Sequence, residues 1–79
     1  MLTEYIEAAM RHAKYRIYPD NSFYGEIPEC PGVCANEVTL EECRNVLQEV
    51  LEGWMMVRLH ENLEIPVIED VELEVTVTA

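Results

Sequence analysis

The chain has 79 residues, with 16 acidic and five basic side chains and a formal net charge of −11. This length predicts a single domain with a small core, for which self-association is an expected source of stability. The negative charge disfavours direct binding to nucleic acids, where lysine and arginine supply most of the affinity, and favours a basic protein partner. Solubility alone is an equally good explanation of this charge.

No stretch of the sequence predicts a membrane span or a secretory signal. The longest unbroken apolar run covers residues 54–57, far fewer than the ~20 residues of a membrane helix. Acidic residues come early, and no basic segment precedes a hydrophobic one. We therefore expect a cytoplasmic protein. Its cysteines, Cys30, Cys34 and Cys43, are expected to be free thiols, because disulfides are rare in that compartment.

The first part of the chain predicts a helix followed by a strand. Apolar side chains recur at helical spacing through residues 1–13, so we expect a short amphipathic helix there. Over residues 14–18 the period changes to two, with Tyr15 and Ile17 on the same side. This alternation is typical of a half-buried strand.

A hairpin and a short third strand are expected next. Residues 19–22 have the composition of a turn, and residues 23–27 alternate again, so a second strand should return beside the first. Gly25 falls on the inward side, where it would allow a helix to approach the sheet closely. Residues 33–36 are long enough for only a short third strand.

Residues 39–62 predict one long amphipathic helix, around which the rest of the domain is organised. Thr39 and Glu42 match a capping box at its start, and Asn62 is suited to a left-handed residue at its end. Gly53 weakens the helix unless it admits a close neighbour, which suggests a subunit contact. The apolar stripe that should face the sheet comprises Leu40, Cys43, Val46, Leu47, Val50, Leu51, Trp54 and Met55.

The end of the chain, residues 69–79, predicts an acidic strand. Apolar side chains at Val71, Leu73, Val75 and Val77 alternate with acids and threonines. Such a strand either completes its own sheet or pairs with another subunit. The expected fold is therefore an α+β domain of order α-β-β-β-α-β, with a small antiparallel sheet packed on one long helix.

We expect no catalytic residue, metal ligand or cofactor. A metal-dependent nuclease needs several carboxylates converging on its ions, and Glu26 is the only acid inside the three early strands. Acids near Cys30 and Cys34 should raise the thiol pKa values and leave both unreactive. His12 and His60 have no catalytic partner at motif spacing, so surface or helix-end positions are expected.

The run Tyr-Gly-Glu-Ile-Pro-Glu-Cys-Pro-Gly-Val over residues 24–33 is followed by Thr-Leu-Glu-Glu over residues 39–42, which opens a long helix with a late aromatic residue, Trp54. Together with Ile65-Pro66 after the helix, these features resemble the HicB-like antitoxin family over residues 14–68. The resemblance implies a truncated ribonuclease-H-like fold without nuclease activity, which silences a small basic HicA-like toxin that cleaves messenger RNA. The chain looks like the short, single-domain members, which lack a DNA-binding module.

The leading functional hypothesis is therefore a non-enzymatic antitoxin-like protein that forms a dimer or higher oligomer. The acids expected to face the toxin are Glu41, Glu49, Glu52, Glu72 and Glu74. The expected oligomer contacts are Gly53, Trp54, Met55, Val71, Leu73, Val75 and Val77. For Trp54 and Met55, core or dimer packing is favoured over a binding surface for another partner. The alternatives are an orphan oligomeric scaffolding protein and, less favoured, a hydrolase that depends on Glu26.

Overall fold

The computed structural model describes residues 2–69 of the chain. Its elements are α1 (Leu2–Arg11), β1 (Lys14–Ile17), β2 (Phe23–Glu26), β3 (Cys34–Glu37) and α2 (Leu40–His60). The α+β class and the element order are thus confirmed through α2. The expected C-terminal strand, with Val71, Glu72, Leu73, Glu74, Val75 and Val77, lies outside the described residues.

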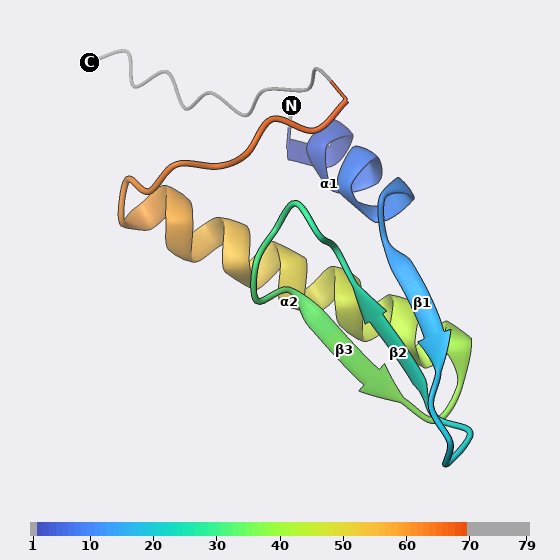
Figure 1. Ribbon diagram of the computed structural model, residues 1–79. Coiled ribbons are helices and arrows are strands. Elements are labelled where there is room, and N and C mark those ends of the chain that lie inside the picture. Colours follow the sequence, from blue (N-terminus) through green and yellow to red (C-terminus); the bar gives the residue numbers. More distant parts are fainter. Residues whose placement is uncertain (1, 70–79) are drawn as a thin grey trace.

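The three strands form one antiparallel sheet in the order β1-β2-β3. In this sheet Gly25 of β2 lies between Tyr15 of β1 and Ala35 of β3. Helix α2 lies across one side of the sheet, where it packs against β2 and β3, and it also contacts α1 (Figure 1). Residues 61–69 then return from the end of α2 toward α1 (Figure 1). The core lies between these layers.

The apolar stripe of α2 is confirmed over most of its length. Its fully buried residues are Cys43, Leu47, Leu51 and Met55, a row of four-residue steps that lies along one side of the helix. Leu40 is an exception to the prediction, because its side chain is 47% exposed. It lies on the same side of the helix as Leu47, in the first turn of α2.

Strand β1 is exposed, so the prediction of a half-buried strand is wrong. Tyr15 is 36% exposed and Ile17 is 65% exposed, because β1 is an edge strand and α2 packs against the other two strands of the described sheet. The prediction for Gly25 is confirmed. A Cβ atom there would lie 2.8 Å from Cε1 of Tyr15 and 3.2 Å from Sγ of Cys43, so only glycine admits both the tyrosine ring and the helix.

Both ends of α2 are closed by residues that the sequence predicts, although of the two capping-box bonds the described residues show only the one accepted by Thr39. The backbone N–H of Glu42 donates to the hydroxyl of Thr39 over 3.1 Å. At the other end Asn62 adopts a left-handed conformation with φ 55°, and the N–H of Leu63 donates to the carbonyl of Arg58 over 2.8 Å. The close neighbour suggested for Gly53 is not found within the described residues, since no atom lies within 4 Å of a Cβ built there.

Candidate functional site

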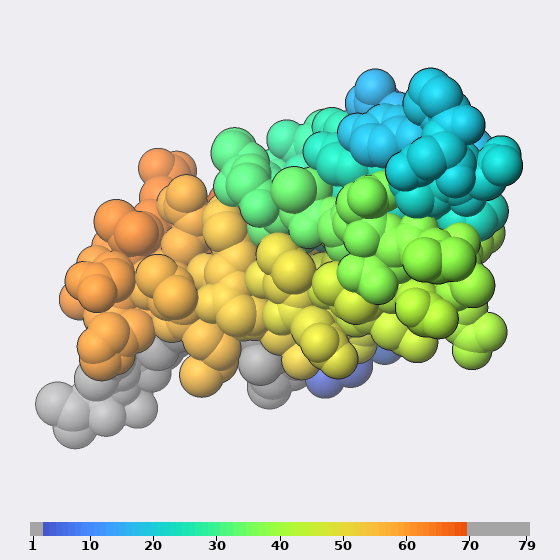
Figure 2. Space-filling model, turned by 90° about the horizontal axis from the view of Figure 1, so that it is seen from below, coloured from blue at the N-terminus to red at the C-terminus, as the bar shows by residue number. Residues whose placement is uncertain are grey.

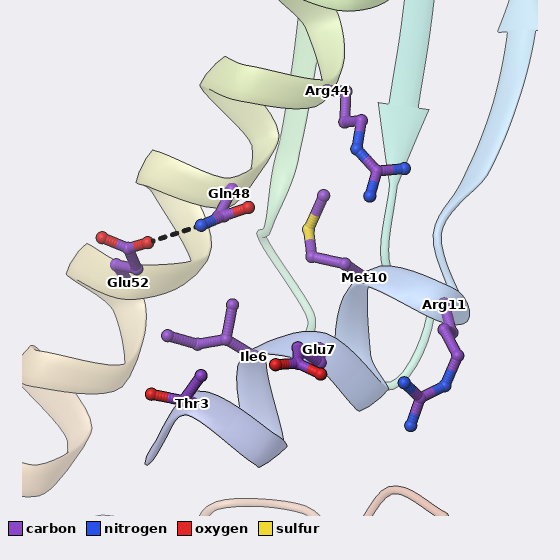
Figure 3. A pocket seen from close by; sticks show the side chains of 8 residues that line it. All are labelled: Thr3, Ile6, Glu7, Met10, Arg11, Arg44, Gln48 and Glu52. Atoms are coloured by element: carbon purple, nitrogen blue, oxygen red, sulfur yellow. Dashed lines mark hydrogen bonds between the residues drawn. The ribbon is translucent and has the colours of Figure 1, made fainter.

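An acidic surface covers the outer side of α2, away from its buried row. We call Glu41, Glu49 and Glu52 the acidic face, because all three are exposed and their spacing places them on the same side of the helix. The amide nitrogen of Gln48 donates to Glu52 over 3.1 Å and fixes one carboxylate on this side (Figure 3). In Figure 2 the outer side of α2 crosses much of the visible surface, from yellow-green to orange.

Exposed apolar side chains follow the acidic face toward the end of α2. Met56 is 61% exposed and Val57 is 59% exposed. Of the residues that the sequence nominates for oligomer contacts here, Gly53 is exposed and Trp54 is half-buried. Met55 lies in the core of the single chain. The exposed apolar residues, Met56 and Val57, are therefore one and two positions after Met55, the last oligomer contact nominated in α2.

A groove separates α1 from α2 (Figure 3) and has a volume of about 570 Å³. Ile6 and Met10 contribute its apolar side chains, and Arg11 and Arg44 bring positive charge from the two helices. Sequence reasoning missed this groove, because periodicity predicts each helix but not how the two helices lie against each other. The complete lining is Thr3, Ile6, Glu7, Met10, Arg11, Arg44, Gln48 and Glu52.

The segment after α2 is held against α1 by buried and polar contacts. Tyr5 is fully buried, and its hydroxyl donates to the backbone carbonyl of Pro66. Ile68 is 2% exposed and belongs to the same core as Tyr5. Nearby, Arg11 binds Glu69 with its Nη2 atom 2.8 Å from Oε1 and its Nε atom 3.2 Å from the same oxygen. These contacts hold residues 66–69 against α1 and the core.

His12 joins three parts of the chain at this point. Its Nδ1 atom lies 2.6 Å from Oε2 of Glu29, in the loop between β2 and β3, and its Nε2 atom lies 2.9 Å from Oε2 of Glu69. We call this set of contacts the clasp. Its members are Tyr5, Arg11, His12, Glu29, Pro66 and Glu69. Sequence reasoning expects a surface or helix-end position for His12, which lies directly after α1, but it predicted neither of the two partners.

The charges in the clasp shift one another's protonation. The hydrogen bond to Glu29 is the main cause that raises the pKa of His12, against a smaller opposing effect of burial. The same bond lowers the pKa of Glu29. The pKa of Glu69 is lowered chiefly by its hydrogen bond to Arg11. Each shift favours the charged form of the group.

The cysteines are free thiols in the structure, with Cys30 and Cys43 buried and Cys34 exposed. Burial is the main cause that raises the pKa of Cys30, and the neighbouring Glu29 raises it further, as the sequence predicts for an acidic surrounding. Glu26, the acid considered for a hydrolase, forms an ion pair with Arg16 over 3.1 Å. Within residues 2–69, no three His, Cys, Asp or Glu side chains are grouped as metal ligands.

Neither described helix combines the length and the apolar character that crossing a bilayer requires. The fold of the described residues is thus a small α+β domain with two helices and a three-stranded antiparallel sheet, and its most distinctive surfaces are the acidic face and the clasp. The family model described as UPF0150-like matches residues 4–66, so the chain belongs to the UPF0150-like family.

The chain is also similar to a solved structure, the crystal structure of TTHA0281 from Thermus thermophilus. The two sequences are 40% identical, the TM-score is 0.88, and the match covers 94% of this chain and 93% of the other. Among curated proteins, no relative matches the chain.

Proposed function

We propose that the chain is a non-enzymatic, antitoxin-like protein of a type II toxin-antitoxin system, which binds and masks a small basic toxin that cleaves messenger RNA. The observation that carries this proposal is the acidic face, where three carboxylates are exposed along one side of α2. The UPF0150-like family is related to HicB, which supports the same assignment. We further propose that the sheet and α2 form a truncated ribonuclease-H-like fold of the HicB-like kind.

The mechanism is occlusion, and it requires no chemistry from this chain. A toxin that cleaves RNA needs a basic surface to bind phosphates, and the acidic face offers opposite charge that steers such a surface into contact. Met56 continues the same side of α2 with apolar area, and Val57 adjoins it, which is the usual composition of a helix that docks on a partner. The proposal places the protein in the cytoplasm, where messenger RNA is the toxin's substrate.

The test is co-expression with the small basic protein encoded next to the gene, followed by growth and co-purification. Wild type should restore growth and bind the toxin. The variant Glu41→Gln, Glu49→Gln, Glu52→Gln should weaken binding by roughly tenfold or more, because it removes the charge that steers association. A matched control, Glu4→Gln, Glu61→Gln, Glu64→Gln, changes the net charge equally at exposed acids elsewhere.

The control should bind within a factor of about three of wild type, because its three acids lie outside the acidic face. An effect of net charge alone would instead weaken binding equally in both variants. Equal loss in the two variants would show that total charge is responsible and not the acidic face. Absence of binding to any small basic toxin, with the chain correctly folded, would refute the antitoxin assignment.

A second candidate is an orphan oligomeric scaffolding protein. The exposure of Met56 and Val57 favours it, because exposed apolar side chains that adjoin each other are typical of surfaces between subunits. The gene neighbourhood separates the two candidates, because the gene of a scaffold should have no short basic neighbour. Light scattering of wild type and of Met56→Glu tests whether Met56 lies between subunits, in which case the variant should lose its oligomeric mass.

A further inference from the structure

The surroundings of His12 fix its charge state. Both ring nitrogens face carboxylate oxygens, Nδ1 at 2.6 Å from Glu29 and Nε2 at 2.9 Å from Glu69. A carboxylate only accepts hydrogen bonds, and a neutral imidazole has a single N–H to donate. Both contacts are therefore satisfied only when His12 carries a proton on each nitrogen.

Glu29 depends on this contact more than an ordinary surface acid would. Its Oε2 atom is bound by His12, whereas its Oε1 atom is buried and has no hydrogen-bond partner among the described residues. The Glu29 side chain is 36% exposed, but its buried oxygen keeps a desolvation cost that is no longer offset once the carboxylate loses its donor. Loss of the second proton from His12 thus leaves either Glu29 or Glu69 facing a nitrogen lone pair.

We propose that doubly protonated His12 is a latch, which ties the segment after α2 to the end of α1 and to the β2–β3 loop, and which opens on one side when His12 loses a proton. The segment that it holds contains Pro66, bound by Tyr5, and Ile68, which is buried in the core. The inference does not depend on the proposed function.

Charged groups from each neighbouring element bear on the latch. Helix α1 supplies Arg11, which binds Glu69 and keeps that carboxylate in place when His12 is neutral. Strand β1 supplies Lys14, whose charge favours ionised Glu29. Helix α2 supplies Arg58, which acts on the adjoining Tyr5 and Cys30. Glu69 therefore keeps a donor, Arg11, when His12 is neutral, whereas no other described side chain donates to Glu29, so the remaining proton should stay on Nδ1 and the contact with Glu69 should open first.

The direction of the pH effect follows from these shifts. The pKa of His12 is raised above 6.5 in the folded chain, so its contribution is complete below 6.5 and is lost as the pH rises through the raised value. The pKa values of Glu29 and Glu69 are lowered below 4.5, so their contribution is complete above 4.5 and is lost as the pH falls through the lowered values. The latch is fully closed between these limits.

The test is a nuclear magnetic resonance titration of the full chain between about pH 5.5 and 8.5, the range in which histidine changes charge. We expect the backbone amide signals of Val67, Ile68 and Glu69 to shift with the same midpoint as the ring protons of His12. In His12→Gln, which keeps a polar side chain but cannot titrate, these shifts should disappear. His60→Gln is the matched control, because it removes the other histidine, an exposed one at the end of α2, and should leave the shifts unchanged.

Glu29→Gln keeps the test informative if the His12 variant does not fold. It should lower the titration midpoint of His12, and it should do so more than Glu69→Gln, because Glu29 is the larger cause of the shift. The inference is overturned if the amides of residues 67–69 do not titrate with His12 in wild type, if they still titrate in His12→Gln, or if neither glutamate variant moves the His12 midpoint.

Discussion

The β1–β2 hairpin and the clasp lie at different ends of β1 and are stabilised in different ways. In the hairpin turn, Tyr18 donates its N–H to the carbonyl of Ser22 over 2.9 Å, and Ser22 donates both its N–H and its hydroxyl to Asp20. These partners are two to four positions apart. In the clasp, Tyr5 and Pro66 are 61 positions apart. The hairpin is thus determined by neighbouring residues, whereas the clasp forms only when the whole chain has folded.

The largest expected effect tests whether the two regions share one core. Leu47 is fully buried in α2, so Leu47→Ala should lower the free energy of unfolding by about 2–5 kcal/mol and destabilise the hairpin and the clasp together. Leu40→Ala is the matched control on the same helix and should cost less than about 1 kcal/mol, because Leu40 is half exposed. Urea unfolding followed by circular dichroism measures both. Similar losses in the two variants would contradict the observed end of the buried stripe.

The next effect should be largest in the hairpin. In Gly25→Ala the new methyl group would meet the Tyr15 ring at 2.8 Å and the Cys43 sulfur at 3.2 Å, so we expect a loss of about 1–3 kcal/mol in unfolding free energy. Tyr15→Ala in the same chain should recover part of that loss, because it removes the closest atoms. Gly53→Ala is the control, and it should stabilise α2 by about 0.5–1 kcal/mol, since no atom lies within 4 Å of its Cβ. Thermal unfolding of wild type and these variants measures the differences.

A smaller effect separates the clasp from the hairpin. Tyr5→Phe keeps the buried ring but removes the donor to the Pro66 carbonyl, which should cost about 1 kcal/mol. Tyr18→Phe is the matched control in the hairpin, where the exposed ring stacks on Tyr24 with 5.4 Å between centroids, and it should cost almost nothing. Amide hydrogen exchange should show faster opening near Pro66 in the first variant only. Equal exchange in both would show that the clasp does not depend on this bond.

The same contrast explains how much the sequence predicts. Periodicity placed α1, the three strands and α2 within a few residues, and Thr39 and Asn62 marked the ends of α2 correctly, because each of these signals is local. Alternation in β1 shows that Tyr15 and Ile17 share a side, but it does not show whether another element covers that side. The exposure of Ile17 therefore had to come from the structure.

In the candidate site, too, the part that depends on local spacing was predicted, and the part that depends on contacts between distant residues was not. The three carboxylates of the acidic face were predicted because helical spacing alone places them together. The clasp was not, since no sequence spacing relates His12 to Glu29 and Glu69, which approach it from a loop and from the segment after α2. A lone histidine at a helix end with acids elsewhere in the chain was the only available signal, and an acidic chain offers many such pairs.

The smallest predicted effect concerns the turn that directs the chain from α2 toward the clasp. Asn62 has φ 55°, a conformation that asparagine and glycine tolerate better than other residues. Asn62→Ala should therefore cost about 0.5–1 kcal/mol, whereas Asn62→Gly should stay within a few tenths, because glycine has no Cβ to strain but loses more entropy on folding. If the turn only ends the helix, the loss in Asn62→Ala, measured by urea unfolding, should be independent of pH. If it also positions Glu69 for His12, the loss should be larger at about pH 6 than at about pH 8, where the latch is weakened.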